Sequence, residues 1–177
     1  MKYHIRRSER EITDSKEFSA ILSKCKYAVI ALCTNNQPYI VTLSYGYDET
    51  ENALYFHCAK EGQKIDFIKT NPNACATIIE DDGFDANSCD HSYRSLVIRG
   101  AIEFVDKRGE IDHAIQLMIL QLEKNEPEKF MEKLKVGNKS YDNLQILRMN
   151  IDHITGKVRQ KNASERNGPV ASSSITL

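Results

Sequence analysis

The sequence predicts an α+β domain, built on a mainly antiparallel, barrel-like sheet of six strands with flanking helices. Six β-rich runs are separated mostly by short polar turns, which is typical of an antiparallel meander. Helical patterns occur only at the start, after the third strand and before the last strand. A doubly wound parallel sheet would need a helix between nearly every pair of strands, and the first three strands leave no room for them.

The 177 residues fit one domain, which is large enough to bury a continuous core without disulfides or metals. Only 41% of the residues are hydrophobic, and the polar ends account for part of this low value. We assign residues 1–160 to the folded domain. Residues 161–177 form a polar segment without core-forming residues, which we expect to be a flexible tail.

The first half of the chain predicts two helices and three strands. A helix is expected from Asp14 to Cys25, because Asp14 and Glu17 have capping-box spacing and apolar residues recur on one face. The three strands that follow are expected at 27–33, 39–47 and 53–59. A short amphipathic helix then ends at Asn71 and Pro72, since the residue before a proline disfavours helical dihedral angles.

The second half predicts three more strands and a helical segment. The expected strands are 74–80, 93–105 and 144–154. Gly100, inside the long strand, suggests a bend or bulge of the kind that barrels need. The polar stretch 81–91 is expected to be a loop. Residues 109–135 show helical spacing, and Pro127 restarts the chain as a second helix.

Charge and cysteine content narrow the class of protein. With 24 basic and 25 acidic side chains the net charge is −1, which gives no electrostatic case for nucleic acid or an anionic membrane as a partner. No segment has the apolar length of a membrane span or the pattern of a signal peptide. The five cysteines lack CxxC spacing, so they fit neither a secreted disulfide framework nor a zinc ribbon. We therefore expect a cytoplasmic protein.

The predicted loop contains five residues that could ligate a metal ion: Asp81, Asp82, Cys89, Asp90 and His91. A loop with C-x-H spacing does not supply the four defined ligands of a zinc site. Ordinary loop residues are the favoured interpretation, and we predict no metal site.

The stretch "YFHCAKEGQKIDFIKTNP", residues 55–72, changes abruptly from a strand into a basic turn and a helix. Lys60, Gly62 and Lys64 lie in the turn and the first helical turn. Free backbone N–H groups, the positive end of the helix dipole and the ammonium groups would favour a bound phosphate there. The alternative is an exposed basic loop, since "KEGQK" is no Walker loop, and the spacing alone favours this alternative.

His57 lies near the end of the strand before this turn, and period-two alternation places it on the opposite face from Phe56 and Cys58. An imidazole changes protonation near neutral pH, so His57 could donate a proton or a hydrogen bond to an anionic substrate. The alternative is a histidine that is hydrogen-bonded at a strand end.

Two further polar pairs could serve a ligand. Arg94 and Ser95, at the start of the long strand, offer a cation and a hydroxyl to a phosphate; the alternative is that Arg94 pairs with acidic residues of 80–85. Lys157 and Arg159 follow a Thr-Gly turn and could also contact a ligand. The alternative interpretation is that they belong to a charged, fraying end of the chain.

Several motifs, taken in order, resemble one flavoprotein family. The segments "REITD", "YFHCAKEGQKID", "NPNACATI", "SYRSLVIRGAIEFV" and "ITGK" follow one another as in the pyridoxamine 5′-phosphate oxidase-related flavoproteins. The similarity is to the branch that includes nitroimidazole-resistance (Nim) proteins. It covers about residues 7–160, and its most specific part is the H-x-A-x-x-G-x-K-x-D pattern of 57–66.

This resemblance implies a split β-barrel homodimer that binds FMN in two clefts at the subunit interface. The residues that would line the flavin are Thr42, Leu43, Ser44, His57 and Cys58. The ribityl phosphate would be held by Lys64 and Ser95, with Arg94 as a further contact, while Lys157 and Arg159 would reach the flavin from the second subunit. His57 matches a histidine that lies over the flavin and contacts a bound small molecule, so it is the expected catalytic residue.

Two classes of function follow as hypotheses. An FMN-dependent oxidoreductase would pass a hydride or electrons from reduced flavin to a small organic acceptor, of which a nitroaromatic is one example. The second hypothesis is a flavin- or heme-binding carrier, sensor or store without turnover. The basic residues that bind pyridoxal phosphate near the C-terminus of the true oxidase have no recognisable match here, so the resemblance does not imply that activity. A deazaflavin in place of FMN also stays open.

Overall fold

The structure is a computed structural model that describes residues 5–86, 90–133 and 144–159. The predicted tail and Cys89 lie outside these ranges, so their assignments stay predictions. The elements, in chain order, are η1 (Ser8–Arg10), β1 (Glu11–Ile12), α1 (Ser15–Lys24), β2 (Tyr27–Thr34), β3 (Gln37–Asp48), β4 (Ala53–Ala59), α2 (Gln63–Thr70), β5 (Asn73–Asp85), β6 (Asp90–Val105), α3 (Arg108–Leu122), α4 (Pro127–Lys133), β7 (Leu144–Asn150) and β8 (His153–Arg159).

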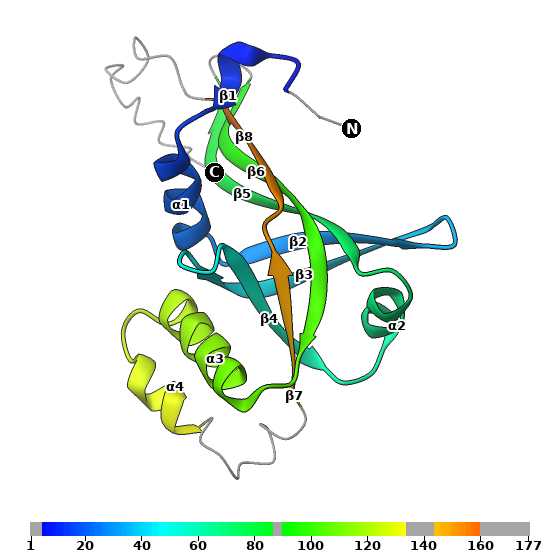
Figure 1. Cartoon of the computed structure of the whole chain (residues 1–177). Helices are drawn as coiled ribbons and strands as arrows, with labels where there is room; N and C mark the ends of the chain where they lie inside the picture. Colours follow the sequence, from blue (N-terminus) through cyan, green and yellow to red (C-terminus); the bar gives the residue numbers. More distant parts are fainter. Residues whose placement is uncertain (1–4, 87–89, 134–143, 160–177) are drawn as a thin grey trace, which may run out of the picture.

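Six strands close into an antiparallel barrel (Figure 1). The ring runs β6-β5-β2-β3-β4-β7, and β7 returns to pair with β6. Outside the ring, β8 pairs with β6, and the two-residue β1 pairs with β8. The predicted α+β fold with a six-stranded antiparallel barrel is therefore confirmed, and β8 and β1 extend it.

The strands of the ring are steeply staggered. Starting at Val105 on β6, we follow cross-strand partners once round the ring, through Ile146 on β7 and His57 on β4. The path returns to β6 at Ser95, which is ten residues before its starting point. A stagger of this size means that the strands tilt strongly against the barrel axis. One cross-strand row on the outer face therefore runs from His57 on β4 across β3, β2 and β5 to Ser95 on β6.

Alternate residues of the ring fill its interior, as the period-two pattern of a sheet requires. The interior core contains Ala28, Ile30, Leu32, Tyr45, Leu54, Phe56, Ala76, Ile78, Leu96, Ile98, Leu147 and Met149. The helix α1 adds Ile21 and Leu22 to this core, and α2 adds Ile65 and Ile68. Asp14 caps α1 as predicted, since its carboxylate accepts a hydrogen bond from the backbone N–H of Lys16.

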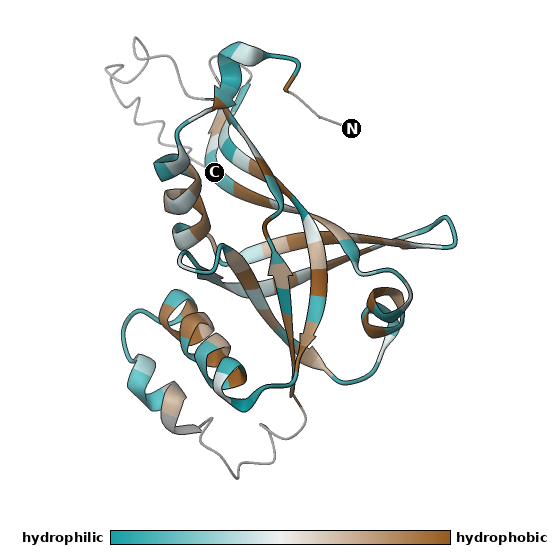
Figure 2. Ribbon diagram, in the orientation of Figure 1, coloured by the Kyte–Doolittle hydropathy of each residue, from teal (hydrophilic) through white to brown (hydrophobic). Residues whose placement is uncertain are grey.

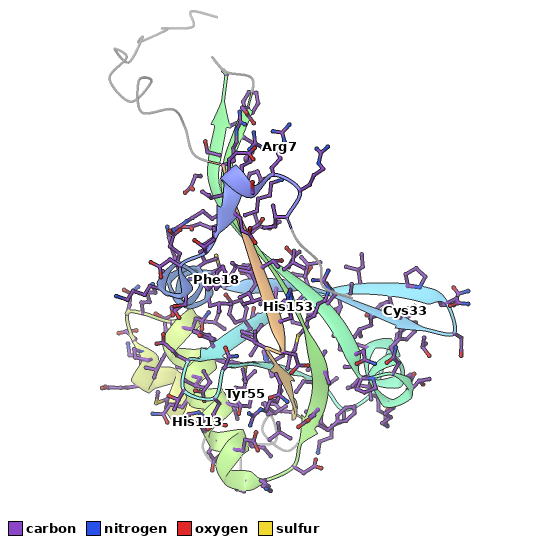
Figure 3. The ribbon with its side chains drawn as sticks, turned by 45° about the horizontal axis from the view of Figure 1, so that its top comes forward. Arg7, Phe18, Cys33, Tyr55, His113 and His153 are labelled. Atoms are coloured by element: carbon purple, nitrogen blue, oxygen red, sulfur yellow. The ribbon has the colours of Figure 1, made fainter. Side chains whose placement is uncertain are left out.

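The helix α3 packs on the outside of the barrel, against β3 and β4, with its own apolar cluster (Figure 2). His113 Nε2 lies 2.6 Å from the buried Asp48 carboxylate, and the His113 ring meets the Tyr55 ring edge-on. Figure 3 labels His113 and Tyr55. Burial raises the pKa of Asp48, but hydrogen bonds from His113 and from backbone N–H groups outweigh it and lower the pKa. Gln121 donates to the Leu22 and Cys25 carbonyls, which ties α3 to the end of α1.

The prediction of a loop at 81–91 was wrong over most of its length. The β5–β6 ladder continues past an irregularity between Asp81 and Phe84 to the pair formed by Asp85 and Asp90. The segment is polar because this end of the hairpin is exposed, and exposed strands need no apolar residues. Among the described residues, no group of three or more His, Cys, Asp or Glu is placed to hold a metal ion.

The prediction of one last strand at 144–154 was also wrong, because the chain breaks into β7 and β8 around Asp152. β7 lies between β4 and the end of β6, whereas β8 pairs with the earlier half of β6. Asp152 donates its backbone N–H to the Arg99 carbonyl at this change of partner. Thr155 and Gly156, predicted to form a turn, lie inside β8.

Gly100 lies where β6 changes its partner from β8 to β7, and a Cβ there would lie 1.8 Å from the Asn150 carbonyl oxygen. We predict that Gly100→Ala lowers the free energy of unfolding by about 3 kcal/mol, the upper end of the cost of overpacking. Urea unfolding measures the loss. Gly109→Ala is the control, because nothing lies within 4 Å of its added Cβ. Equal stability of the two variants would contradict a tight closure at Gly100.

Candidate flavin-binding site

The outer face of the barrel opens between β3 and β4. Pairing between these strands ends at Tyr45 and Phe56. Beyond that pair, β3 continues to Gln37 alongside β2, and β4 continues to Ala59 alongside β7. The two facing edges therefore separate, and backbone groups that point into the opening can bond a ligand. We call this place, between residues 42–44 of β3 and 57–58 of β4, the β3–β4 opening.

Five of the residues predicted to line a flavin border the β3–β4 opening, but their side chains point to different faces. Thr42, Ser44 and His57 alternate with core residues and lie on the outer face. Leu43 and Cys58 pack against the barrel core. A ligand in the opening would meet the first three through their side chains and the last two through their backbone.

The His57 imidazole lies on the outer face, one residue beyond the Phe56 pair that ends the β3–β4 ladder. Neighbouring protein atoms remove part of its water, and this burial lowers the pKa of His57 below the ordinary histidine value. A neutral imidazole with one N–H donor is therefore the main form at neutral pH, and the fraction of imidazolium rises as the pH falls.

The basic turn begins at Lys60, directly after β4 ends at Ala59. Gly62 has φ of 120°, a conformation that suits glycine, and it begins α2 without a side-chain cap. Lys64 lies in the first turn of α2, near Cys58: burial raises the pKa of the Cys58 thiol, and the Lys64 charge offsets part of the rise. An uncapped helix start beside an ammonium group can hold an anion.

Ser95 and Lys157 form a second polar group, on the outer face of β6 and β8. The two residues are direct cross-strand neighbours. The Lys157 ammonium lies 5.8 Å from the centre of the Tyr93 ring. Between Ser95 and the β3–β4 opening lie β2 and β5, so roughly 14 Å of sheet separates Ser44 from Ser95 at the usual strand spacing.

Arg94 and Arg159, which were predicted beside these residues, are engaged in ion pairs. Arg94 alternates with Ser95, and its guanidinium lies 2.5 Å from the buried Glu80 carboxylate, which Lys24 also contacts. Arg159 pairs with Asp90. Burial raises the pKa of Glu80, but Lys24 and Arg94 outweigh it and hold the pKa below its usual range. The structure thus brings Arg94 to Glu80, as the alternative interpretation of the sequence expected.

Sequence reasoning missed an apolar band on the outer face between the two polar groups. Tyr27, Ile40 and Ile79 are 61%, 64% and 58% exposed and lie on β2, β3 and β5. Toward the β2–β3 hairpin the same face opens into a pocket of about 570 Å³, lined in part by Cys33 and Cys75. The alternation of β2 already predicts that its odd-numbered residues share one face. The sequence alone does not tell that this face is left uncovered by the rest of the chain.

Comparison with known sequences identifies the family. The sequence family described as pyridoxamine 5′-phosphate oxidase matches residues 14–158, which is most of the chain. The chain belongs to this family. A curated relative, an uncharacterised protein of Rhizobium meliloti (strain 1021), is 30% identical over 89 residues, which are 50% of this chain and 53% of that protein. The chain thus spans about half the length of this relative.

Solved structures share the fold of this family member. One is described as a candidate 5-nitroimidazole antibiotic resistance protein of Bacteroides thetaiotaomicron, with 23% identity, a TM-score of 0.69 and coverage of 89% of this chain and 96% of that one. The flavocytochrome Anf3 of Azotobacter vinelandii has 17% identity, a TM-score of 0.75 and coverage of 90% and 73%.

A third structure, an FAD- and heme-binding protein of Mycobacterium smegmatis, has 17% identity, a TM-score of 0.67 and coverage of 88% and 78%. At these identities the similarity shows the common fold. In the described part of the chain, no helix is long and apolar enough to cross a membrane.

We predict that Arg94→Met destabilises the protein by about 3 kcal/mol at neutral pH, because it leaves Glu80 buried with less compensation. The folded pKa of Glu80 is lowered, so the pair contributes fully above the unfolded carboxyl value of about 4.3 and loses its contribution as the pH falls through the folded pKa. Urea unfolding from neutral to acidic pH tests this.

The control for Arg94→Met is Lys16→Ala, at an exposed position of α1. Unchanged stability of Arg94→Met together with lost flavin binding would instead assign Arg94 to the phosphate.

Proposed function

We propose that this chain is an FMN-dependent oxidoreductase of the cytoplasm, which passes electrons or a hydride from reduced flavin to a small organic acceptor, as a nitroimidazole reductase does. The observation that carries the proposal is the β3–β4 opening, which has His57 at its edge and the start of α2 close behind. Backbone edges and an imidazole border the opening, and an ammonium group lies in the first turn of the helix that follows β4. These are the groups that a ring system with a phosphate tail requires.

The residues present fit FMN in both polarity and position. The separated strand edges at Thr42–Ser44 and His57–Cys58 offer backbone donors and acceptors to the polar edge of the ring. The uncapped start of α2 and Lys64 offer a site for the phosphate. When bound, the flavin supplies the electron-transfer chemistry, and the protein supplies position and electrostatics.

In this proposal, His57 donates to the acceptor molecule. Its side chain lies on the outer face, where a molecule from solvent can reach it. The neutral imidazole donates a hydrogen bond from one ring nitrogen, and the imidazolium donates a proton. Because burial lowers the pKa of His57, proton donation becomes more frequent as the pH falls below the ordinary histidine value.

A second copy of the chain would complete the cleft. The outer face carries a polar group at each end and exposed apolar side chains between them, and large exposed apolar patches mark interaction sites. Ser95 and Lys157 lie on β6 and β8, three and four strands from the β3 edge of the opening by way of β2 and β5. In a homodimer, Ser95 and Lys157 would approach the flavin held by the other chain.

The second candidate is a flavin- or heme-binding module without turnover. Two structures with this fold are a flavocytochrome and an FAD- and heme-binding protein, which is the observation that favours it. His57, as an exposed imidazole, could also ligate a heme iron. Kinetics of the His57 variant separate the two candidates.

We predict that His57→Ala keeps FMN bound but slows reoxidation of the reduced flavin by a small organic acceptor about 100-fold, as for loss of a general acid. Stopped-flow absorbance at matched flavin occupancy measures this half-reaction. In the unsubstituted protein the rate should rise as the pH falls below about 6.5, and this dependence should disappear in the variant. His153→Ala, at an exposed position of β8, is the control. An unchanged rate would favour the binding module.

We predict that Lys64→Ala and Lys157→Ala each weaken FMN binding about 10- to 150-fold, the value of one charge-assisted contact. A mixed dimer, with one chain of each variant, should regain one site of full affinity, because one of its clefts then contains both lysines. Fluorescence titration of the doubly tagged, purified mixed dimer measures this.

Lys69→Ala, at an exposed position in the last turn of α2, is the control for these lysine variants. If both sites of the mixed dimer stay weak, the two lysines act within one chain. A stable monomer that holds FMN tightly would reject the shared cleft altogether.

A further inference from the structure

Tyr27 is the most exposed aromatic side chain of the β2–β3–β5 face. It begins β2 and is 61% exposed, while the neighbouring even-numbered residues of β2, Ala28 and Ile30, are buried in the barrel. A large aromatic side chain on an uncovered sheet face does not gain the free energy that its burial would give. Something outside the chain is therefore expected to cover it.

The register places Tyr27 beside the β3–β4 opening. Tyr27 pairs directly with Ser44 on β3, so both side chains point to the outer face. His57 lies on the other side of Ser44, one residue beyond the last β3–β4 pair. Two strand spacings, at least about 10 Å, therefore separate the strands that carry Tyr27 and His57. The small Ser44 side chain forms the floor between them.

The register thus sets an imidazole and a phenol on either side of a small polar residue of the outer face. A planar ring system above Ser44 would meet the imidazole on one side and the phenol on the other. Aromatic rings gain from edge-to-face or offset contact, and the polar floor can bond the ring edge. The next cross-strand pair of the face, Val29 and Thr42, has small side chains.

We propose that Tyr27 forms the second wall of the flavin site, opposite His57 of the same chain, with the flavin ring held over Ser44. The inference rests on the proposed function, because it names a further contact of the same site. It assigns Tyr27 a positioning role: the phenol fixes where the ring lies and takes no part in proton transfer.

The test is flavin fluorescence, because a nearby phenol quenches the excited flavin by electron transfer and a phenyl ring does not. Tyr27→Phe should keep FMN affinity and raise the fluorescence per bound flavin several-fold. Tyr27→Trp should keep it quenched. Tyr27→Leu should raise the fluorescence and also weaken binding about 2- to 12-fold, the range for one lost aromatic contact. Tyr47→Phe, at a position packed against the barrel core, is the matched control.

A mixed dimer assigns the tyrosine to its chain. One chain carries Lys64→Ala with Tyr27→Phe, and the other is unsubstituted, so limiting FMN fills the site with intact Lys64 first. Quenched fluorescence at that site supports Tyr27 of the same chain, and bright fluorescence overturns this placement. If FMN binds and Tyr27→Phe stays as dim as the unsubstituted protein, Tyr27 is not a wall of the site. If FMN does not bind the unsubstituted protein, the proposed function fails instead.

Discussion

The barrel closes because β6 changes its pairing partner part-way along its length. β6 pairs with β8 up to Arg99 and with β7 from Ile102, and Gly100 lies between, against the Asn150 carbonyl. This change lets β7 close the ring and leaves β8 outside it. A side chain at Gly100 would press against β7 and strain the closure that aligns β4 with the other strands.

Closure with a ten-residue stagger also determines where the barrel opens. Because β4 is held by β7 on one side, it follows β7 away from β3 after Phe56, and the opening forms at His57. The helix that follows β4 then begins beside the opening, which brings Lys64 close to Cys58. The candidate site is thus a geometric consequence of ring closure, and the basic turn needs only a short connection to reach it.

Local patterns in the sequence predicted most of the elements, because turn residues and alternation act over a few positions. They placed His57 at a strand end and Lys64 in a first helical turn, as the structure has them. The break between β7 and β8 was not predicted, since it depends on the contact of Asp152 with Arg99, which is distant in sequence. The exposure of Tyr27 was not predicted either, because an exposed face is recognised only when all neighbouring strands are placed. Which partner engages Arg94 likewise depends on the face that the barrel gives it.

Whether the β3–β4 opening holds a flavin can be read from the visible absorption spectrum of the protein purified without added cofactor. Mass spectrometry then identifies the molecule that denaturation releases. We expect the two visible bands of oxidised flavin and the mass of FMN. A Soret band with released heme, or a colourless protein that also fails to bind added FMN, would rule out an FMN site there.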